Sequence, residues 1–228
     1  MTRRTRIKVC CIASTGEARL AVAHGADALG LVSAMPSGPG PIAEPLISEV
    51  AATVPPPVAT FLLTSEARAD TIINQQRRCR ANTLQIVDRL EHGTYRDLRA
   101  ALPGVALVQV IHVTGEDAVA EACRAAHDGA DAILLDSGDQ RLAVKLLGGT
   151  GRTHDWTVSR KIVEAVPVPV FLAGGLNPGN VSDAIRAVRP FGVDVCSGLR
   201  TDGHLDAVKL AAFVAAVAAA DAAVLAEQ

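Results

Sequence analysis

Two residue types that can exchange protons lie at the ends of two apolar runs in this chain. Asp136 closes the run DAILLD (131–136), and Cys10 and Cys11 lie within the run IKVCCI (7–12). A carboxylic acid can protonate a ring or leaving-group oxygen, and a thiolate can remove a proton that a neighbouring iminium group activates. Taken alone, Asp136 could cap a helix and Cys10 could be a small core residue. Together they are suited to paired proton transfers.

Strand alternation bears on which of the two cysteines could reach a site inside a barrel. If Cys10 faces the barrel interior, alternation predicts that Cys11 faces the surrounding helices. The sequence alone does not determine which of the two cysteines faces the interior.

Two later turns contain glycines that suit the binding of an anion. They are AGGLNPGN (173–180) and CSGLR (196–200). Glycine allows a close backbone approach, and the free N–H groups at a helix start favour negative charge. We therefore expect Gly174, Gly175, Ser197 and Gly198 to bind phosphate, with ordinary tight turns as the alternative. Further substrate-binding candidates are Gly148, Gly149 and Arg200; for Arg200 a purely exposed position is the alternative.

Short apolar runs alternate with amphipathic segments along the whole chain. The runs cover 7–12, 27–32, 58–63, 83–88, 106–113, 131–136, 169–175 and 193–198. Helices are expected at 15–25 with a Thr cap, at 114–129, at 177–190 and over the Ala-rich C-terminal segment. Alternating strands and helices imply right-handed crossovers and a parallel sheet. We predict an α/β fold, a single (β/α)8 TIM barrel domain over 1–228, with a doubly wound open sheet as the competitor.

Composition narrows the class of protein. The chain has 228 residues, of which 49% are hydrophobic and 3% aromatic, so the core must be built from aliphatic side chains. The net charge of −2 gives no indication of a nucleic-acid partner. No apolar stretch reaches the roughly 18 residues of a membrane span, and no signal peptide is visible. The five irregularly spaced cysteines indicate reduced thiols and a cytoplasmic location, and their spacing predicts no metal site.

Four motifs together resemble the phosphoribosylanthranilate isomerase family. The family's Lys-x-Cys-Gly-Ile is similar to KVCCI (8–12), and its Leu-Leu-Asp-Ser and Gly-Gly-Thr-Gly-x-x-x-x-Trp match LLDS (134–137) and GGTGRTHDW (148–156). Its next two patterns match LAGGLNPGNV (172–181) and GVDVCSG (192–198). The resemblance runs from about residue 6 to residue 217 and is most specific in the second half.

The resemblance implies an Amadori rearrangement in tryptophan biosynthesis. N-(5-phosphoribosyl)anthranilate would become 1-(2-carboxyphenylamino)-1-deoxyribulose 5-phosphate by an aldose–ketose isomerisation. The family's general base falls on Cys10, its general acid on Asp136, and its phosphate site on the four residues of the glycine-bearing turns. The implied mechanism needs no cofactor, and the implied partner is a small phosphorylated sugar. With the net charge of −2 we expect neither a nucleic-acid nor a membrane partner, and the protein would be a monomer or homodimer.

Departures from the family cluster where an aromatic acid would bind. Cys11 replaces the family's Gly, and the segment SAMPSGPGPI (33–42) lacks the family's Arg. QIVD (85–88) replaces Gln-Leu-His-Gly, and Arg200 replaces a Glu. Arg200 could supply the missing positive charge. The alternatives are a paralogous isomerase or lyase acting on another phosphorylated sugar, and a non-catalytic barrel that binds a phosphorylated ligand.

Overall fold

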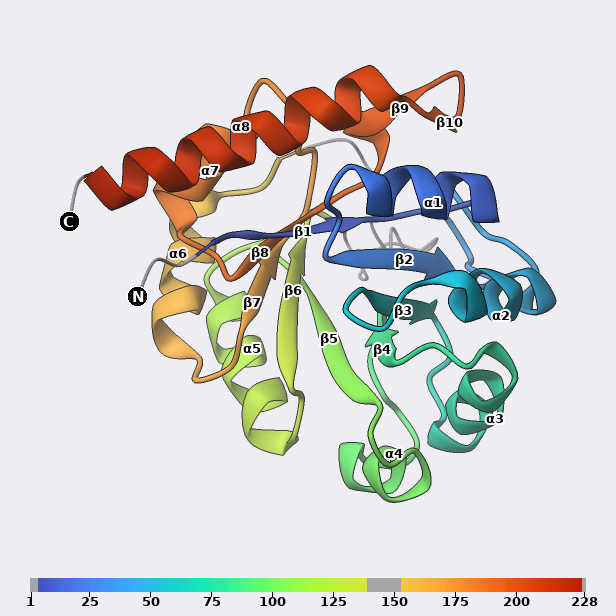
Figure 1. Cartoon of the computed structure of the whole chain (residues 1–228). Coiled ribbons are helices and arrows are strands. Elements are labelled where there is room, and N and C mark those ends of the chain that lie inside the picture. The colour runs from blue at the N-terminus through green and yellow to red at the C-terminus, as the bar shows by residue number, and fades with distance from the viewer. Residues whose placement is uncertain (1–3, 139–152, 227–228) are drawn as a thin grey trace.

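Eight parallel strands pair in sequence order and close into a barrel, which confirms the predicted fold class (Figure 1). The computed structural model describes residues 4–138 and 153–226. The strands are β1 (Arg6–Val9), β2 (Ala28–Val32), β3 (Ala59–Thr64), β4 (Thr83–Ile86), β5 (Ala106–His112), β6 (Ala132–Asp136), β7 (Val170–Leu172) and β8 (Gly192–Val195). Several apolar runs continue beyond the strands, so Cys10 and Gly174 lie in the loops that follow β1 and β7, and Ser197 lies in the turn that follows β8.

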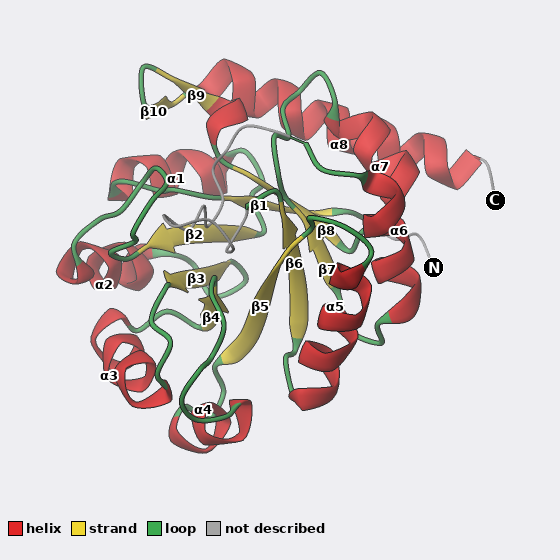
Figure 2. Ribbon diagram, turned by 180° about the vertical axis from the view of Figure 1, so that it is seen from behind, coloured by secondary structure: helices red, strands yellow, loops and turns green. Residues whose placement is uncertain are grey.

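Helices surround the sheet on its outer side (Figure 2). They are α1 (Thr15–Ala23), α2 (Glu44–Thr53), α3 (Ala69–Cys79), α4 (Tyr95–Ala101), α5 (Asp117–Asp128), α6 (Trp156–Ala165), α7 (Val181–Val188) and α8 (Ala207–Ala226). A 3-10 turn, η1 (Ser197–Leu199), and a small antiparallel pair, β9 (Arg200–Thr201) and β10 (His204–Leu205), connect β8 to α8. The cap of α1 is Ser14 rather than Thr15, because the Ser14 side chain accepts a hydrogen bond from the N–H of Glu17.

Apolar side chains form two separate layers on the two faces of the sheet. Between strands and helices lie aliphatic residues such as Val9, Leu29 and Leu84. Inside the barrel, Phe171 packs edge-to-face on both Phe61 and Phe191, with ring centroids 5.9 and 5.4 Å apart. A parallel sheet buried on both faces needs apolar runs of this kind, without strict alternation.

The expectation that no segment is long and apolar enough to span a membrane was wrong, because one helix meets both criteria. Helix α8 has 20 residues and a mean hydropathy of 2.0, which is long and apolar enough. In the fold it lies along α7 (Figure 1), and it buries a stripe formed by Leu210, Phe213, Val217 and Ala220. This stripe has the i, i+3, i+4 spacing of a helix packed on a core.

An ion pair between Lys8 and Asp194 lies inside the barrel. Lys8 and Asp194 are register partners on β1 and β8, and the Lys8 Nζ lies 2.9 Å from Asp194 Oδ2. Lys8 is fully buried, and its ammonium also lies 5.2 Å from the centroid of the Phe61 ring. A charge at this depth is tolerated only when it is paired. The pair therefore joins the first strand to the last.

Replacing Lys8 tests the stability of this closure. Lys8→Met leaves the Asp194 carboxylate buried without its cation, so we expect a loss of about 3–5 kcal/mol in the free energy of unfolding. The double variant Lys8→Met/Asp194→Leu removes both charges and should regain most of that loss. Urea unfolding at pH 7 measures both. A single variant as stable as the original chain would contradict the argument.

Candidate active site

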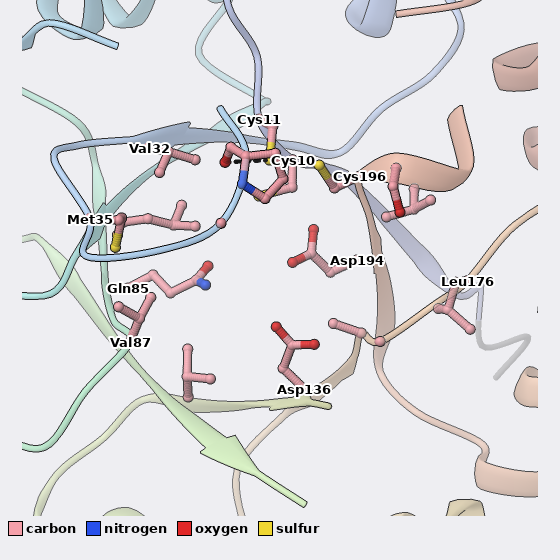
Figure 3. Close-up of a pocket in the computed structure, with 18 of the residues that line it drawn as sticks. Cys10, Cys11, Val32, Met35, Gln85, Val87, Asp136, Leu176, Asp194 and Cys196 are labelled. Carbon is pink, nitrogen blue, oxygen red and sulfur yellow. Dashed lines mark hydrogen bonds between the residues drawn. The ribbon is translucent and has the colours of Figure 1, made fainter. Parts of the chain in front are cut away.

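A pocket opens where the barrel strands end, and it brings the predicted acid and the predicted thiol together (Figure 3). Residues from the ends of β1, β4, β6, β7 and β8 line it, and they include Cys10, Gln85, Asp136, Gly174, Gly175, Asp194 and Ser197. Figure 3 shows the carboxylates of Asp136 and Asp194 pointing into the open space of the pocket. The site therefore joins proton donors and acceptors that are distant in the sequence.

The position of Cys10 follows from the pairing of β1. Its N–H donates to the carbonyl of Val195 at 2.8 Å, which continues the β1–β8 ladder one residue past the strand. Cys10 follows Lys8 by two residues, so both side chains face the barrel interior. Gly30 on β2 makes room for them, because a Cβ there would lie 2.6 Å from Cys10 Sγ and 3.1 Å from Lys8 Nζ.

Cys11 also lines the pocket, contrary to the alternation that the sequence predicts. The strand ends at Val9, and Cys11 has a φ of +61°, in the left-handed region. A residue outside the strand no longer follows its alternation, so both thiols lie on the pocket side. The left-handed backbone costs a non-glycine residue roughly 1–2 kcal/mol, which gives a physical reason for a glycine at this position.

Asp136 has the environment of a general acid. It is the last residue of β6, and burial raises the pKa of its carboxyl, against the opposing effect of the Ser137 N–H, which donates to Oδ1 at 2.7 Å. The nearby His112 and Lys8 also lower the pKa of Asp136, and the nearby Asp194 raises it. The carboxyl therefore keeps its proton to a higher pH than an exposed aspartate would.

The predicted phosphate-binding residues lie together on one side of the pocket. Gly174, Gly175 and Ser197 line it, and the two glycines have φ values of +87° and +63° that favour glycine. Gly198 lies behind them, where a Cβ would be 2.1 Å from the Leu176 carbonyl oxygen. Gly198 thus allows the loops after β7 and β8 to touch. Gly148 and Gly149 lie outside the described residues.

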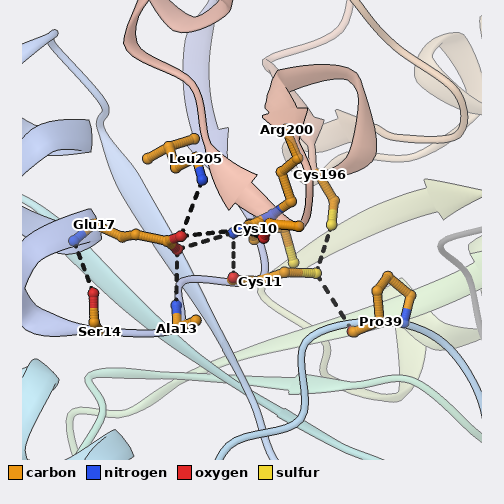
Figure 4. Close-up of polar contacts among 10 residues, drawn as sticks. Cys10, Cys11, Ala13, Ser14, Glu17, Pro39, Cys196, Arg200 and Leu205 are labelled. Atoms are coloured by element: carbon orange, nitrogen blue, oxygen red, sulfur yellow. Dashed lines mark hydrogen bonds and ion pairs between the residues drawn. The ribbon is translucent and has the colours of Figure 1, made fainter.

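Arg200 is engaged away from the pocket (Figure 4). Its Nη1 and Nη2 each lie 3.1 Å from a carboxylate oxygen of Glu17, and Nη2 also donates to the carbonyl of Cys11. Glu17 accepts two more hydrogen bonds, from the N–H groups of Ala13 and Leu205. Arg200 is not among the residues that line the pocket. It ties the segment after β8 to the loop that carries the two cysteines.

Sequence reasoning missed three polar residues of the pocket region: Lys8, Gln85 and Asp194. Within the described part of the chain, Asp194 Oδ1 and Gln85 Oε1 are buried without a hydrogen-bond partner, so both can accept from a bound ligand. The sequence does contain a signal for the ion pair. Lys8 and Asp194 each interrupt an apolar strand, where an unpaired charge would be costly, so the two residues could be expected to pair.

Comparisons of the sequence with known proteins identify one family. A family model described as N-(5′-phosphoribosyl)anthranilate (PRA) isomerase matches residues 7–216. Two proteins named N-(5′-phosphoribosyl)anthranilate isomerase are similar: that of Haloferax volcanii is 39% identical over 96% of both chains, and that of Methanocella arvoryzae is 36% identical over 87% of this chain and 90% of its own. The crystal structure of the Thermotoga maritima phosphoribosyl anthranilate isomerase superposes with a TM-score of 0.77 at 26% identity, over 94% of this chain and 99% of that one.

His154, beside the pocket, should make stability depend on pH. Its Nε2 lies 2.7 Å from Ser159 Oγ, and burial lowers the pKa of the ring to about 4. Between the unfolded value near 6.5 and this folded value, the unfolded chain binds a proton that the folded chain does not, so stability falls as the pH falls. The loss is on the order of 2–3 kcal/mol.

The variant His154→Gln should lack this part of the loss, and His204→Gln, which removes an exposed imidazole, should keep it. Urea unfolding between pH 7 and pH 4 measures the difference. Equal slopes for the original chain and His154→Gln would contradict the assignment.

Proposed function

The chain belongs to the N-(5′-phosphoribosyl)anthranilate isomerase family, and we propose that Cys10 and Asp136 are the general base and the general acid of its reaction. The protein is an isomerase of tryptophan biosynthesis, which converts N-(5′-phosphoribosyl)anthranilate by an Amadori rearrangement. One observation supports this assignment: Cys10, directly after β1, and Asp136, the last residue of β6, line the same pocket.

Asp136 starts the reaction by proton donation. It protonates the furanose ring oxygen, the bond from C1′ to that oxygen breaks, and the anthranilate nitrogen lone pair forms an iminium with C1′. The raised pKa of Asp136 supports this role, because the acid must hold its proton before transfer. The departing oxygen becomes the hydroxyl of the open chain.

Cys10 completes the reaction as a base. The iminium draws electrons from C2′ and makes its proton acidic, so the Cys10 thiolate can remove it. The electrons of the C–H bond form an enolamine, which tautomerises to the 1-amino-1-deoxyketose when C1′ gains a proton. The Cys10 thiol and the Lys8 ammonium both lie beside Gly30 on the inner face of the barrel.

Binding of the substrate phosphate falls to the loops after β7 and β8. We assign it to Gly174, Gly175 and Ser197, with Gly198 allowing the two loops to meet. Free backbone N–H groups and a hydroxyl are suited to an anionic oxygen. The inward-facing Asp194 Oδ1 is placed to accept a hydrogen bond from a sugar hydroxyl.

The aromatic end of the substrate faces a largely apolar wall. Val32, Met35, Leu63 and Val87 line this side of the pocket. Among the described lining residues no arginine is present, and Arg200 is paired with Glu17. Without a charge-assisted, bidentate contact to the anthranilate carboxylate, binding should be weaker by a few kcal/mol than with one, to order of magnitude.

The free thiols and the charge of the chain favour one cellular location and one kind of partner. We place it in the cytoplasm, as the five free cysteines favour, with a small phosphorylated substrate and no nucleic-acid or membrane partner. We propose a monomer or a homodimer, and no metal or cofactor takes part in the steps above.

Substitution of the two proposed residues tests their roles. Cys10→Ser and Asp136→Asn should each lower kcat at least ~100-fold, because each removes one proton transfer. Inhibition by inorganic phosphate should stay nearly unchanged. Cys123→Ser, which removes a thiol on α5 away from the pocket, is the matched control. Steady-state kinetics measure all three, and normal turnover in either variant would remove that residue from the mechanism.

Rescue of a tryptophan auxotroph tests the activity in a cell. A strain that lacks this isomerase should grow without tryptophan when it expresses the chain, and the Cys10→Ser form should fail to restore growth. Soluble, folded protein that does not rescue would show that the pocket, with its altered aromatic end, serves another phosphorylated sugar.

A further inference from the structure

Two thiols that the reaction does not use meet at the rim of the pocket. Cys11 follows β1 and Cys196 follows β8, and their sulfurs lie 2.6 Å apart (Figure 4). This separation exceeds the length of a disulfide bond by only ~0.6 Å. Both cysteines are free in the structure, and both line the pocket.

We propose that Cys11 and Cys196 are a modification site, where a hydroperoxide forms a reversible disulfide between the ends of β1 and β8. The inference concerns the two thiols alone and does not depend on the assignment of the catalytic residues.

The backbone holds the two cysteines in position for this bond. Strands β1 and β8 pair in parallel up to Val9 and Val195, and the Cys10 N–H donates to the Val195 carbonyl. On the other side, Arg200 donates to the Cys11 carbonyl. The left-handed backbone of Cys11 places its side chain on the pocket side, beside Cys196. Bond formation therefore needs a small movement of two sulfurs and no change in the fold.

The two thiols differ in acidity in the way that such a reaction needs. The hydrogen bond with Cys11 holds the pKa of Cys196 below its ordinary value, against the effect of burial, and the nearby Arg200 guanidinium lowers it further. Hydrogen bonds with Cys10 and Cys196, together with burial, raise the pKa of Cys11. Cys196 is thus the more acidic of the two thiols and the better suited to attack, and Cys11 is the partner that resolves the product.

The reaction balances with one peroxide. The Cys196 thiolate attacks one oxygen of hydrogen peroxide, an S–O bond forms, the O–O bond breaks, and hydroxide leaves. Cys11 then loses its proton and attacks the Cys196 sulfur, and the second hydroxide leaves. Two protons convert the hydroxides to two waters, and the two sulfurs have supplied the two electrons. A dithiol reductant reverses the bond by exchange.

The bond would also change one wall of the pocket. Cys11 Sγ lies 3.6 Å from the carbonyl oxygen of Pro39, to which the thiol donates. Gly40 packs directly on this side chain, because a Cβ there would lie 2.6 Å from Cys11 Cβ. A disulfide removes the Cys11 proton, and with it the hydrogen bond that joins this loop to β1.

Thiol counting on the folded, full-length chain tests the proposal. After one equivalent of hydrogen peroxide and then denaturation, three of the five cysteines should react with iodoacetamide, since two of five are joined. The intact mass before alkylation should fall by two hydrogen atoms, and dithiothreitol should restore all five thiols. Peptide mapping should link the peptide of Cys11 to that of Cys196.

Four variants identify the pair. Cys11→Ser and Cys196→Ser should each give no cross-link, whereas Cys10→Ser and Cys79→Ser should still form it, and circular dichroism verifies that each is folded. The Cys10→Ser arm is needed because Cys10 and Cys11 share one tryptic peptide. Five reactive thiols in the treated wild type, or a cross-link that persists in folded Cys11→Ser or Cys196→Ser, would overturn the proposal.

Discussion

The register of β1 on β8 determines which side chains face the reaction. Lys8 and Asp194 are partners across this seam, and their ion pair lies inside the barrel. A slip of one residue would turn Lys8 into the apolar layer under the helices and would move Cys10 off the pocket side. The buried pair opposes such a slip, because either charge alone would be left uncompensated. The position of the proposed base is thus a consequence of how the barrel closes.

Beyond the seam, the loops that follow the strands also shape the pocket. Cys11 enters the pocket because its backbone is left-handed, and Gly198 lets two loops touch where a side chain would collide. Arg200 and Glu17 then hold the loop after β1 in place. The thiols therefore lie on the side of the pocket formed by β1 and β8. Asp136, whose pKa is raised, lies at the end of β6.

The sequence predicts much of this structure, for reasons that differ between regions. Eight apolar runs and their intervening helices were sufficient for the barrel, because both faces of a parallel sheet are apolar. The position of Cys11 could not be predicted, since it depends on where β1 ends. The contact of Arg200 with Glu17 joins distant residues and leaves no local pattern. Lys8 and Asp194 could have been paired, as charges within apolar strands that a closed barrel makes neighbours.

Of the three cysteines at the pocket, we expect Cys10 to face the reacting carbon opposite Asp136. A crystal structure with a product analogue, whose ketone is reduced so that it cannot react, tests this most directly. Cys10 Sγ should lie within about 4 Å of C2′, and Asp136 should lie within hydrogen-bond distance, roughly 3 Å, of the oxygen released from the ring. A ligand whose C2′ contacts one of the other two sulfurs, or whose reacting atoms lie beyond the reach of Asp136, would contradict it.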